Sequence, residues 1–242
     1  MRYLVTGGSS GIGRQICLDL ANRGHQVVCC GRDEGKLEEV RNLAPEGIIP
    51  LPFDVTSIEE CRAALAEQLP FDVAVLNAGT CEYLDAQAFD GELFSRVVAT
   101  NLLGVTNCID AVLSKIQPGG RLALMGSSAS YLPLPRAEAY GASKAAVQYL
   151  ARTLEITLAP QNIAVSYIAP GFVRTPLTDL NDFPMPMRIE VEEASAAIIA
   201  GLESGRSEIH FPKKFTRWLK LVAALPWSLQ RGLITKLVSK QA

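Results

Sequence analysis

The sequence predicts an α/β fold with one doubly wound parallel sheet of about seven strands and helices on both faces. Short apolar runs alternate along the chain with longer segments of helical periodicity. Most of these runs are continuously apolar, as expected of strands that are covered on both faces. The 242 residues, 48% hydrophobic and 20% charged, are consistent with one globular domain with a substantial core.

The expected elements follow one another in regular order. Strands are expected at the apolar runs 2–6, 26–30, 48–52, 73–76, 121–126, 163–168 and 207–211. Helices are expected at the periodic segments 12–23, 33–43, 57–68, 90–116, 139–159 and 191–203. Turn residues at 118–120 and 169–171 separate neighbouring elements. Because strands and helices alternate, we expect right-handed crossovers between parallel strands.

Composition excludes several classes of protein. The formal net charge of −2 creates no global field that would attract nucleic acid. Six cysteines without a C-x-x-C pair indicate buried free thiols in a reducing compartment, and hence a cytoplasmic protein. With His25 and His210 as the two histidines, no metal site is expected. The first strand begins at residue 2, which leaves no room for a signal peptide. No uncharged apolar run reaches about 18 residues, so no transmembrane helix is expected.

A glycine-rich turn, residues 6–13, follows the first predicted strand and opens a helix. Gly7 would allow a tight bend, Gly11 a close approach of the backbone to a pyrophosphate, and Gly13 close packing of the helix. The helix N-terminus offers free N–H groups and the positive end of its dipole. This context predicts a dinucleotide site of the Rossmann type, with a purely structural turn as the alternative. The residues expected around the phosphates are Gly7, Ser9, Ser10, Gly11, Ile12 and Gly13.

The end of the second predicted strand bears on the choice of dinucleotide. An NAD site usually has Asp or Glu there, but this chain has Gly31 followed by Arg32. A guanidinium can pair with a 2′-phosphate, so NADP(H) is favoured over NAD(H). Asp33 weakens this interpretation because it could neutralise Arg32 or hold a ribose itself. Asp54, followed by Val55, is placed to accept from the adenine amine, with turn capping as the competing role.

Tyr140 and Lys144 are one helical turn apart and therefore share a face of the predicted helix. A nearby ammonium would lower the pKa of the tyrosine toward working pH. Tyr140 could then exchange a proton with an alkoxide or alcohol. Ser127 lies thirteen residues before Tyr140, at the end of an apolar run, where its hydroxyl could donate to a substrate oxygen.

Together these motifs resemble the short-chain dehydrogenase/reductase family, over about residues 2–211. The matching motifs are the turn at 6–13, Asn77-Ala78-Gly79, Asn101, Ser127, Tyr140 with Lys144, and Pro170-Gly171. The thirteen-residue spacing to Tyr140 favours Ser127 over the adjacent Ser128 as the family's catalytic serine. The resemblance implies an NAD(P)(H)-dependent oxidoreductase that acts on a carbonyl or secondary alcohol and forms a homodimer or homotetramer.

The resemblance also implies roles for individual residues. Asn101, Ser127, Tyr140 and Lys144 would be catalytic, with Lys144 also holding the nicotinamide ribose. Asn101 would support a water that returns the proton to Tyr140. Asn77, Ala78 and Gly79 would shape the adenine–ribose side of the site. Pro170, Gly171, Val173 and Thr175 would lie against the nicotinamide, with a plain Pro-Gly loop as the alternative.

Apolar residues are expected to form the substrate pocket. The segment 177–188 contains Phe183, Met185 and Met187, which could line a pocket with Tyr131, Leu132 and Leu134. Such a pocket suggests a hydrophobic ketone or a lipid-like or steroid-like carbonyl, although these residues could equally just fill space.

The last thirty residues depart from the family pattern. Residues 1–212 would form the nucleotide-binding catalytic part, and 213–242 a basic, amphipathic helical extension of the same domain. Packing within the protein or a dimer is the simplest interpretation of this extension. Peripheral contact with an anionic membrane is the alternative.

An NADP(H)-dependent oxidoreductase is the leading hypothesis for the whole chain. A non-catalytic NADP(H) sensor, or a membrane-surface interaction protein on the same scaffold, remains the alternative. The presence of Asn101, Ser127, Tyr140 and Lys144 argues against a sensor, which needs none of them.

Overall fold

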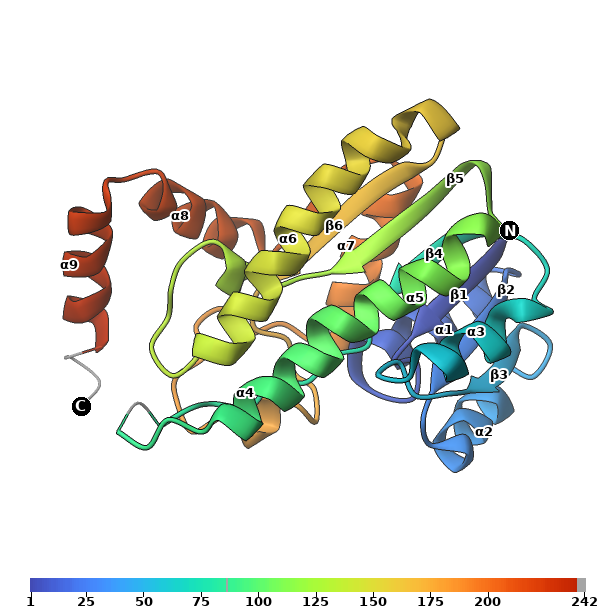
Figure 1. The fold of residues 1–242 in the computed structure, drawn as a ribbon, viewed down its shortest axis with the longest axis horizontal. Helices are drawn as coiled ribbons and strands as arrows, with labels where there is room; N and C mark the ends of the chain where they lie inside the picture. The colour runs from blue at the N-terminus through green and yellow to red at the C-terminus, as the bar shows by residue number, and fades with distance from the viewer. Residues whose placement is uncertain (86, 239–242) are drawn as a thin grey trace.

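One parallel sheet forms the centre of the protein, with helices on both sides (Figure 1). The computed structural model describes residues 1–85 and 87–238. Its seven strands run in the order β3-β2-β1-β4-β5-β6-β7, and every neighbouring pair is parallel. The strands are β1 Arg2–Thr6, β2 Gln26–Gly31, β3 Ile48–Pro52, β4 Phe71–Leu76, β5 Ile116–Met125, β6 Ala164–Pro170 and β7 Glu208–Phe211. The predicted fold class is therefore confirmed.

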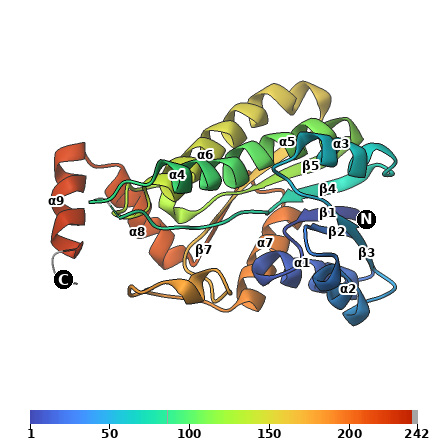
Figure 2. The same cartoon turned by 60° about the horizontal axis from the view of Figure 1, so that its bottom comes forward.

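The helices cover both faces of the sheet, with α1, α2 and α7 on one face and α3 to α6 on the other (Figure 2). Successive strand residues point to opposite faces, so Leu4 and Ala74 belong to one apolar core and Val5 and Val75 to the other. The helices are α1 Gly11–Asn22, α2 Glu34–Leu43, α3 Ile58–Ala66, α4 Gly91–Val98, α5 Gly104–Val112, α6 Glu138–Leu158, α7 Val191–Glu203, α8 Lys213–Ala223 and α9 Trp227–Val238.

The segment predicted as one helix, 90–116, is divided in the structure. A π-helical turn, Ala99–Leu103, joins α4 to α5, and it holds the fully buried side chain of Asn101. By length and composition alone, 91–115 is the one helical stretch among the described residues that could cross a membrane. Its two helices pack against α3 and α6, as core helices do.

The turn predicted at 118–120 lies inside β5. Phe71 pairs with Ile116 but Val73 with Arg121, so the intervening residues of β5 bulge out of the ladder. Gly119 has a φ of +87°, a conformation that glycine adopts without steric cost.

The sheet is built outward in one direction from β1 to β3 and in the other direction from β4 to β7, so the order of the strands reverses between β1 and β4. In sheets of this kind, ligands bind at this point, beyond the carboxyl ends of the strands. The helices α8 and α9 follow β7 and also lie beyond the carboxyl ends of the strands (Figure 1). Residues 239–242 of the predicted extension lie outside the described residues.

Candidate active site

A cleft of about 500 Å³ opens at the carboxyl ends of the strands. Most of the predicted site residues line it. They are Gly7, Ser9, Ser10, Gly11, Ile12, Arg32, Asp54, Val55, Asn77, Ala78, Gly79, Ser127, Tyr140, Lys144, Pro170, Gly171, Val173 and Thr175. Gly13 and Asn101 are not in the lining. The fold thus brings together side chains that are far apart in the sequence.

The glycine-rich turn is closely packed. Gly7 and Gly11 have positive φ values of 66° and 52°. A Cβ on Gly13 would lie 2.2 Å from the carbonyl oxygen of Gly7, so only glycine fits there. Ser10 precedes α1 in an extended conformation, and no acidic residue occurs in the first helical turn. The N-terminus of α1 therefore faces the cleft as a favourable position for an anion.

Thr6 and Asn77 hold this turn in place. The Thr6 hydroxyl accepts hydrogen bonds from the backbone N–H groups of Asn77 at 3.0 Å and Ala78 at 3.1 Å. The Asn77 amide donates to the carbonyl oxygens of Thr6 and Gly7 at 3.0 and 3.2 Å. The Asn-Ala-Gly segment thus joins the end of β4 to the turn after β1 and stabilises that turn.

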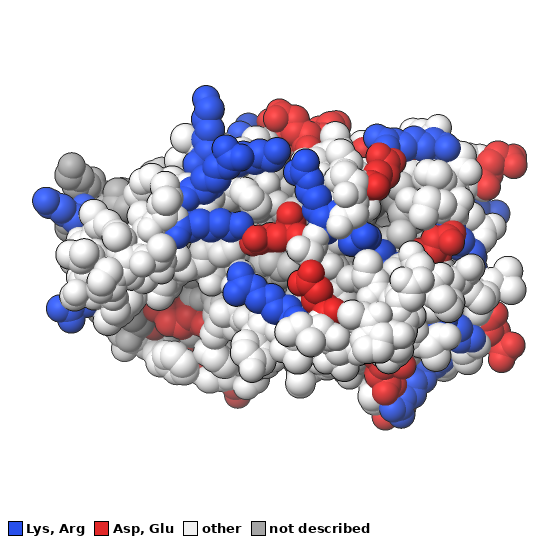
Figure 3. Space-filling model, turned by 90° about the horizontal axis from the view of Figure 1, so that it is seen from above, with Lys and Arg blue, Asp and Glu red and all other residues white. Residues whose placement is uncertain are grey.

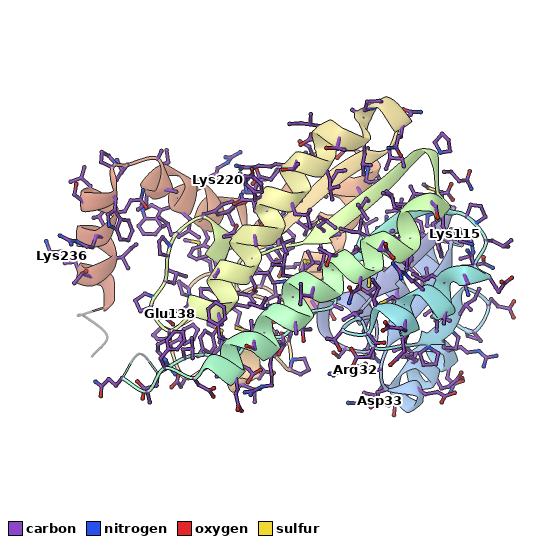
Figure 4. All side chains as sticks on the ribbon, in the orientation of Figure 1. Arg32, Asp33, Lys115, Glu138, Lys220 and Lys236 are labelled. Atoms are coloured by element: carbon purple, nitrogen blue, oxygen red, sulfur yellow. The ribbon has the colours of Figure 1, made fainter. Side chains whose placement is uncertain are left out.

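Arg32 and Asp33 lie side by side after β2 (Figure 4). Asp33 caps α2 by accepting from the Lys36 N–H at 3.1 Å, and it also pairs with the Lys36 ammonium at 3.4 Å. Arg32 instead pairs with Asp54 at 3.6 Å and remains 75% exposed. The suspected neutralisation of Arg32 therefore involves Asp54 rather than Asp33.

Asp54 combines two contacts. One carboxylate oxygen accepts from the backbone N–H and the hydroxyl of Thr56, both at 2.8 Å, which is the turn-capping role. The other oxygen faces Arg32. Burial acts to raise the pKa of Asp54, but the Thr56 hydrogen bonds and the Arg32 charge outweigh burial and lower it. Asp54 is therefore an anion at neutral pH.

Ser127 follows β5 and is held from β6. The Tyr167 hydroxyl lies 3.2 Å from both the backbone nitrogen and the carbonyl oxygen of Ser127. It also lies 2.7 Å from the Ser130 hydroxyl, which donates to the same carbonyl at 2.7 Å. The Ser127 side chain is 8% exposed and accepts from the Ala129 N–H at 3.1 Å. Its backbone is thus fixed by residues that the sequence analysis did not single out.

Tyr140 and Lys144 lie together in the cleft, with the Lys144 ammonium 5.8 Å from the centre of the Tyr140 ring. The ammonium donates to the carbonyl oxygen of Met125 at 3.0 Å. Burial lowers the pKa of Lys144 from 10.5 to about 8. Burial also raises the pKa of Tyr140; Cys81 acts in the same direction, whereas the Ser127 hydroxyl opposes it.

The direction of the Tyr140 pKa differs from the expectation that Lys144 would lower it. Desolvation dominates at this position, and it disfavours the charged form of each group. Tyr140 is therefore a neutral phenol at neutral pH, a state in which it can donate a proton.

Asn101 connects the π-helical turn with the loop after β4. Its side-chain oxygen accepts from the Thr80 N–H at 2.8 Å, and its amide donates to the Thr80 carbonyl at 2.9 Å. The same amide donates to the Ser143 hydroxyl at 3.1 Å. A Cβ on Gly79 would lie 3.1 Å from the Asn101 oxygen and 3.3 Å from the Lys144 ammonium. Asn101 thus lies behind Gly79, on the side where Lys144 is.

The segment after β6 closes the other side of the cleft. A Cβ on Gly11 would lie 3.3 Å from the Thr175 methyl, so this segment approaches the glycine-rich turn. The Thr178 hydroxyl donates to the Val173 carbonyl at 2.6 Å. Val173 also forms an isolated parallel bridge with Ile189. These contacts hold the start and end of the 177–188 segment together.

Three residues predicted for the substrate pocket lie elsewhere. The Tyr131 hydroxyl donates to Glu208 at 2.7 Å, and Leu132 packs with Leu219 and Val222 of α8. Leu134 lines a separate groove beside α9. The prediction was wrong for Tyr131 and Leu132 because α8 packs on them, and Leu134, 38% exposed, is outside the lining of the cleft.

Phe183 of the predicted substrate segment instead belongs to a series of aromatic contacts. The Phe183 ring lies 5.2 Å from Tyr83 and 6.1 Å from Phe172, and Phe172 lies 5.6 Å from Phe215 of α8. From the predicted substrate segment, Leu177 and Leu180 line the cleft itself. These two leucines give this part of the cleft lining apolar side chains, beside Thr175 and Thr178.

Comparison with known proteins agrees with this geometry. The model of the short chain dehydrogenase family matches residues 2–182. This chain belongs to the short-chain dehydrogenase/reductase family. It is 33% identical over 232 residues to an uncharacterized oxidoreductase of Myxococcus xanthus, with 92% of each chain covered.

Two solved structures of short-chain dehydrogenases are also similar. One is a short chain dehydrogenase from Burkholderia cenocepacia in complex with NADP, with a TM-score of 0.85, 26% identity and coverage of 96% of this chain and 97% of the other. The second is a Sphingobium yanoikuyae short-chain dehydrogenase in complex with NADPH, with a TM-score of 0.79, 26% identity and coverage of 97% and 95%. As a member of the family, the protein is an NAD(P)-dependent oxidoreductase.

Proposed function

We propose that this short-chain dehydrogenase/reductase uses NADP(H) to interconvert an apolar carbonyl compound and its secondary alcohol. One observation carries the proposal. Ser127, Tyr140 and Lys144 line the same cleft as the glycine-rich turn at the N-terminus of α1. A dinucleotide with its phosphates at that turn could extend toward the three side chains.

In the proposed reaction, Ser127 donates a hydrogen bond to the substrate oxygen and orients it. The neutral phenol of Tyr140 protonates this oxygen as charge develops on it. The nicotinamide, when bound, supplies or accepts the hydride. Lys144 holds the nicotinamide ribose, and its ammonium stabilises the phenolate that remains on Tyr140. As a neutral phenol, Tyr140 can act as the acid that reduction of a carbonyl requires.

Asn101 has a positioning role in this proposal. Its side-chain oxygen and amide both form hydrogen bonds with the Thr80 backbone, and the amide also donates to the Ser143 hydroxyl. Asn101 therefore fixes the loop after β4 against α6. The Thr80 backbone and the Lys144 ammonium are thereby held in a constant relation. A water near this position could return a proton to Tyr140 through Lys144.

Arg32 supports the choice of NADP(H). Its exposed guanidinium lies at the rim of the cleft, and Asp33 is occupied with Lys36. The Ser9 hydroxyl is nearby, since a Cβ on Gly31 would lie 3.3 Å from it. A 2′-phosphate at this place would meet a cation and a hydroxyl donor. The NADP and NADPH complexes of the two similar structures point in the same direction.

The apolar side chains of Leu177 and Leu180 in the cleft lining support a hydrophobic carbonyl substrate. An NADPH-oxidation screen across aldehydes, ketones, quinones and acyl thioester ketones tests the proposal. Bulky apolar ketones should be reduced faster than small polar ones. The opposite order would reject the apolar pocket. If none of these compounds leads to oxidation of NADPH, the proposed reaction is rejected.

A further inference from the structure

Helix α8 contacts the body of the protein with only part of its surface. Its buried residues are Thr216, Leu219 and Val222. Trp218 and Leu221 lie on another side of the helix, 44% and 71% exposed, and Leu225 follows just beyond its end, 37% exposed. Packing against the protein therefore explains one apolar stripe of α8 and leaves a second one in solvent.

Helix α9 continues this exposed surface. Leu229 and Leu233, one helical turn apart, are 55% and 41% exposed, whereas Trp227, 56% exposed, lines the groove between α9 and the body together with Ile234. The helix is held to the body by Ile234, which packs near Leu132, and by hydrogen bonds from the Gln230 amide to the end of α8. We call the five exposed residues of this segment the C-terminal apolar face: Trp218, Leu221, Leu225, Leu229 and Leu233.

Basic residues accompany the C-terminal apolar face. Lys214 and Arg217 precede Trp218 and Leu221 by four residues each, so each lies on the same side of α8 as the apolar residue that follows it. Within the described part of the chain, neither forms an ion pair, whereas Lys220 is paired with Glu208 at 2.7 Å. A cationic surface is thus combined with exposed tryptophans.

The charge is a property of the whole C-terminal segment. Residues 209–242 hold seven basic and no acidic residues, a charge of +7, so the rest of the chain carries −9 to give the net −2. Viewed from above, basic side chains gather toward the end of the molecule where α8 and α9 lie (Figure 3). Figure 4 labels Lys220 and Lys236 on these helices. The segment therefore attracts anions although the protein as a whole does not.

We propose that α8 and α9 bind the surface of an anionic lipid membrane through the C-terminal apolar face. Amphipathic helices with basic residues and exposed tryptophans lie in the interface between headgroups and acyl chains. Anionic headgroups match Lys214 and Arg217. A second copy of the chain matches them poorly, because symmetric pairing of this face would bring the same cations together.

Of the two tryptophans of the chain, Trp218 belongs to this face and Trp227 lines the adjoining groove, so intrinsic fluorescence reports on the two C-terminal helices. The purified full chain is mixed with vesicles of phosphatidylcholine alone or of phosphatidylcholine with phosphatidylserine. We expect the emission to shift to shorter wavelength with the anionic vesicles, and the shift to weaken as salt is added. Absence of a shift, together with no sedimentation with either kind of vesicle, would overturn the proposal.

Variants locate the contact. Lys214→Gln and Arg217→Gln should each lower binding to the anionic vesicles about fivefold. Leu221→Ser should lower it about tenfold or more. Leu69→Ser, 67% exposed at the other end of the molecule, and Arg62→Gln serve as matched controls and should leave binding unchanged.

Equal loss in the variants and controls would overturn the proposal, because binding would then not depend on this face. Sedimentation equilibrium without lipid tests whether a second copy of the chain binds this face instead of a membrane. An oligomer that Leu221→Ser dissociates, in a chain that does not bind vesicles, would show that the face joins two copies and would also overturn the proposal.

Discussion

The ring of Tyr167 lies against the backbone of Gly126, so that a Cβ on Gly126 would be 2.1 Å from a ring carbon. Tyr167 is 4% exposed, and its hydroxyl reaches past Gly126 to the backbone of Ser127. The absence of a side chain at one residue thus lets a tyrosine of β6 fix the next residue, which faces the cleft.

Tyr167→Phe should therefore affect both stability and turnover. It removes the partner of the buried Ser127 N–H, which should lower the free energy of unfolding by about 1–3 kcal/mol. Turnover should fall about tenfold, because the Ser127 hydroxyl is no longer held in position. Urea denaturation and steady-state kinetics measure the two effects. Tyr149→Phe, at a residue 78% exposed on α6, should change neither. Normal turnover in Tyr167→Phe would show that Ser127 does not depend on this contact.

Arg32→Ala tests the choice of dinucleotide. Loss of a charge-assisted contact with the 2′-phosphate should weaken NADPH binding about 10–100-fold, while NADH binding changes about twofold or less. Fluorescence titration of the two dinucleotides measures this difference. Lys36→Ala is the matched control, because Lys36 is a nearby exposed cation already paired with Asp33. Equal weakening of NADPH and NADH would remove the assignment.

Lys144 should destabilise the fold at neutral pH. Its pKa falls from 10.5 to about 8 on folding. At pH values below 8 this shift lowers the free energy of unfolding by about 3 kcal/mol. Between these two values the unfolded chain binds more protons than the folded one, so this penalty disappears as the pH rises toward 10.5.

Lys144→Met should remove this pH dependence. The variant should be more stable than the original protein at pH 7, by about 1–3 kcal/mol after loss of the hydrogen bond to Met125. The difference should vanish by about pH 10. Urea denaturation at several pH values measures it. A variant less stable than the original protein at pH 7 would contradict the claim that the buried Lys144 ammonium destabilises the fold.

The sequence alone was sufficient for features that depend on local patterns. Strands β1 and β3 have the predicted bounds, and the glycine-rich turn lies where strand and helix periodicity meet. The π-helical turn at Asn101 was not predicted, because it depends on contacts of that side chain with Thr80 and Ser143. Periodicity does not reveal contacts between distant segments.

The misplaced pocket residues have a similar cause. Tyr131 and Leu132 follow the site serine and are apolar, so a pocket was a reasonable prediction, but α8 packs on them from more than eighty residues away. The pKa of Tyr140 was predicted from one neighbour, Lys144, whereas burial by the whole fold decides it. One feature of the sequence indicates the contact of Tyr167 with Ser127, namely the glycine immediately before Ser127.

Cys81 should be the thiol that reacts first in the folded protein. It is partly exposed, whereas the other free cysteines, Cys17, Cys29, Cys30, Cys61 and Cys108, are buried. Burial raises the pKa of Cys81, so alkylation by N-ethylmaleimide should be slow at pH 7 and faster at higher pH. Because Cys81 influences the pKa of both Tyr140 and Lys144, its modification should inhibit turnover. Mass spectrometry identifies the modified cysteine, with Cys81→Ala as control. Modification of a buried cysteine before Cys81 would contradict the prediction that Cys81 reacts first.

Tyr140→Phe tests the proposed chemistry most directly. The variant keeps the ring and removes the hydroxyl that is proposed to donate the proton. Turnover of the best carbonyl substrate from the NADPH screen should fall about 10²–10⁴-fold, while the dissociation constant for NADPH stays nearly unchanged. Turnover equal to that of the original protein, with NADPH bound equally well, would contradict the role of Tyr140 as the acid.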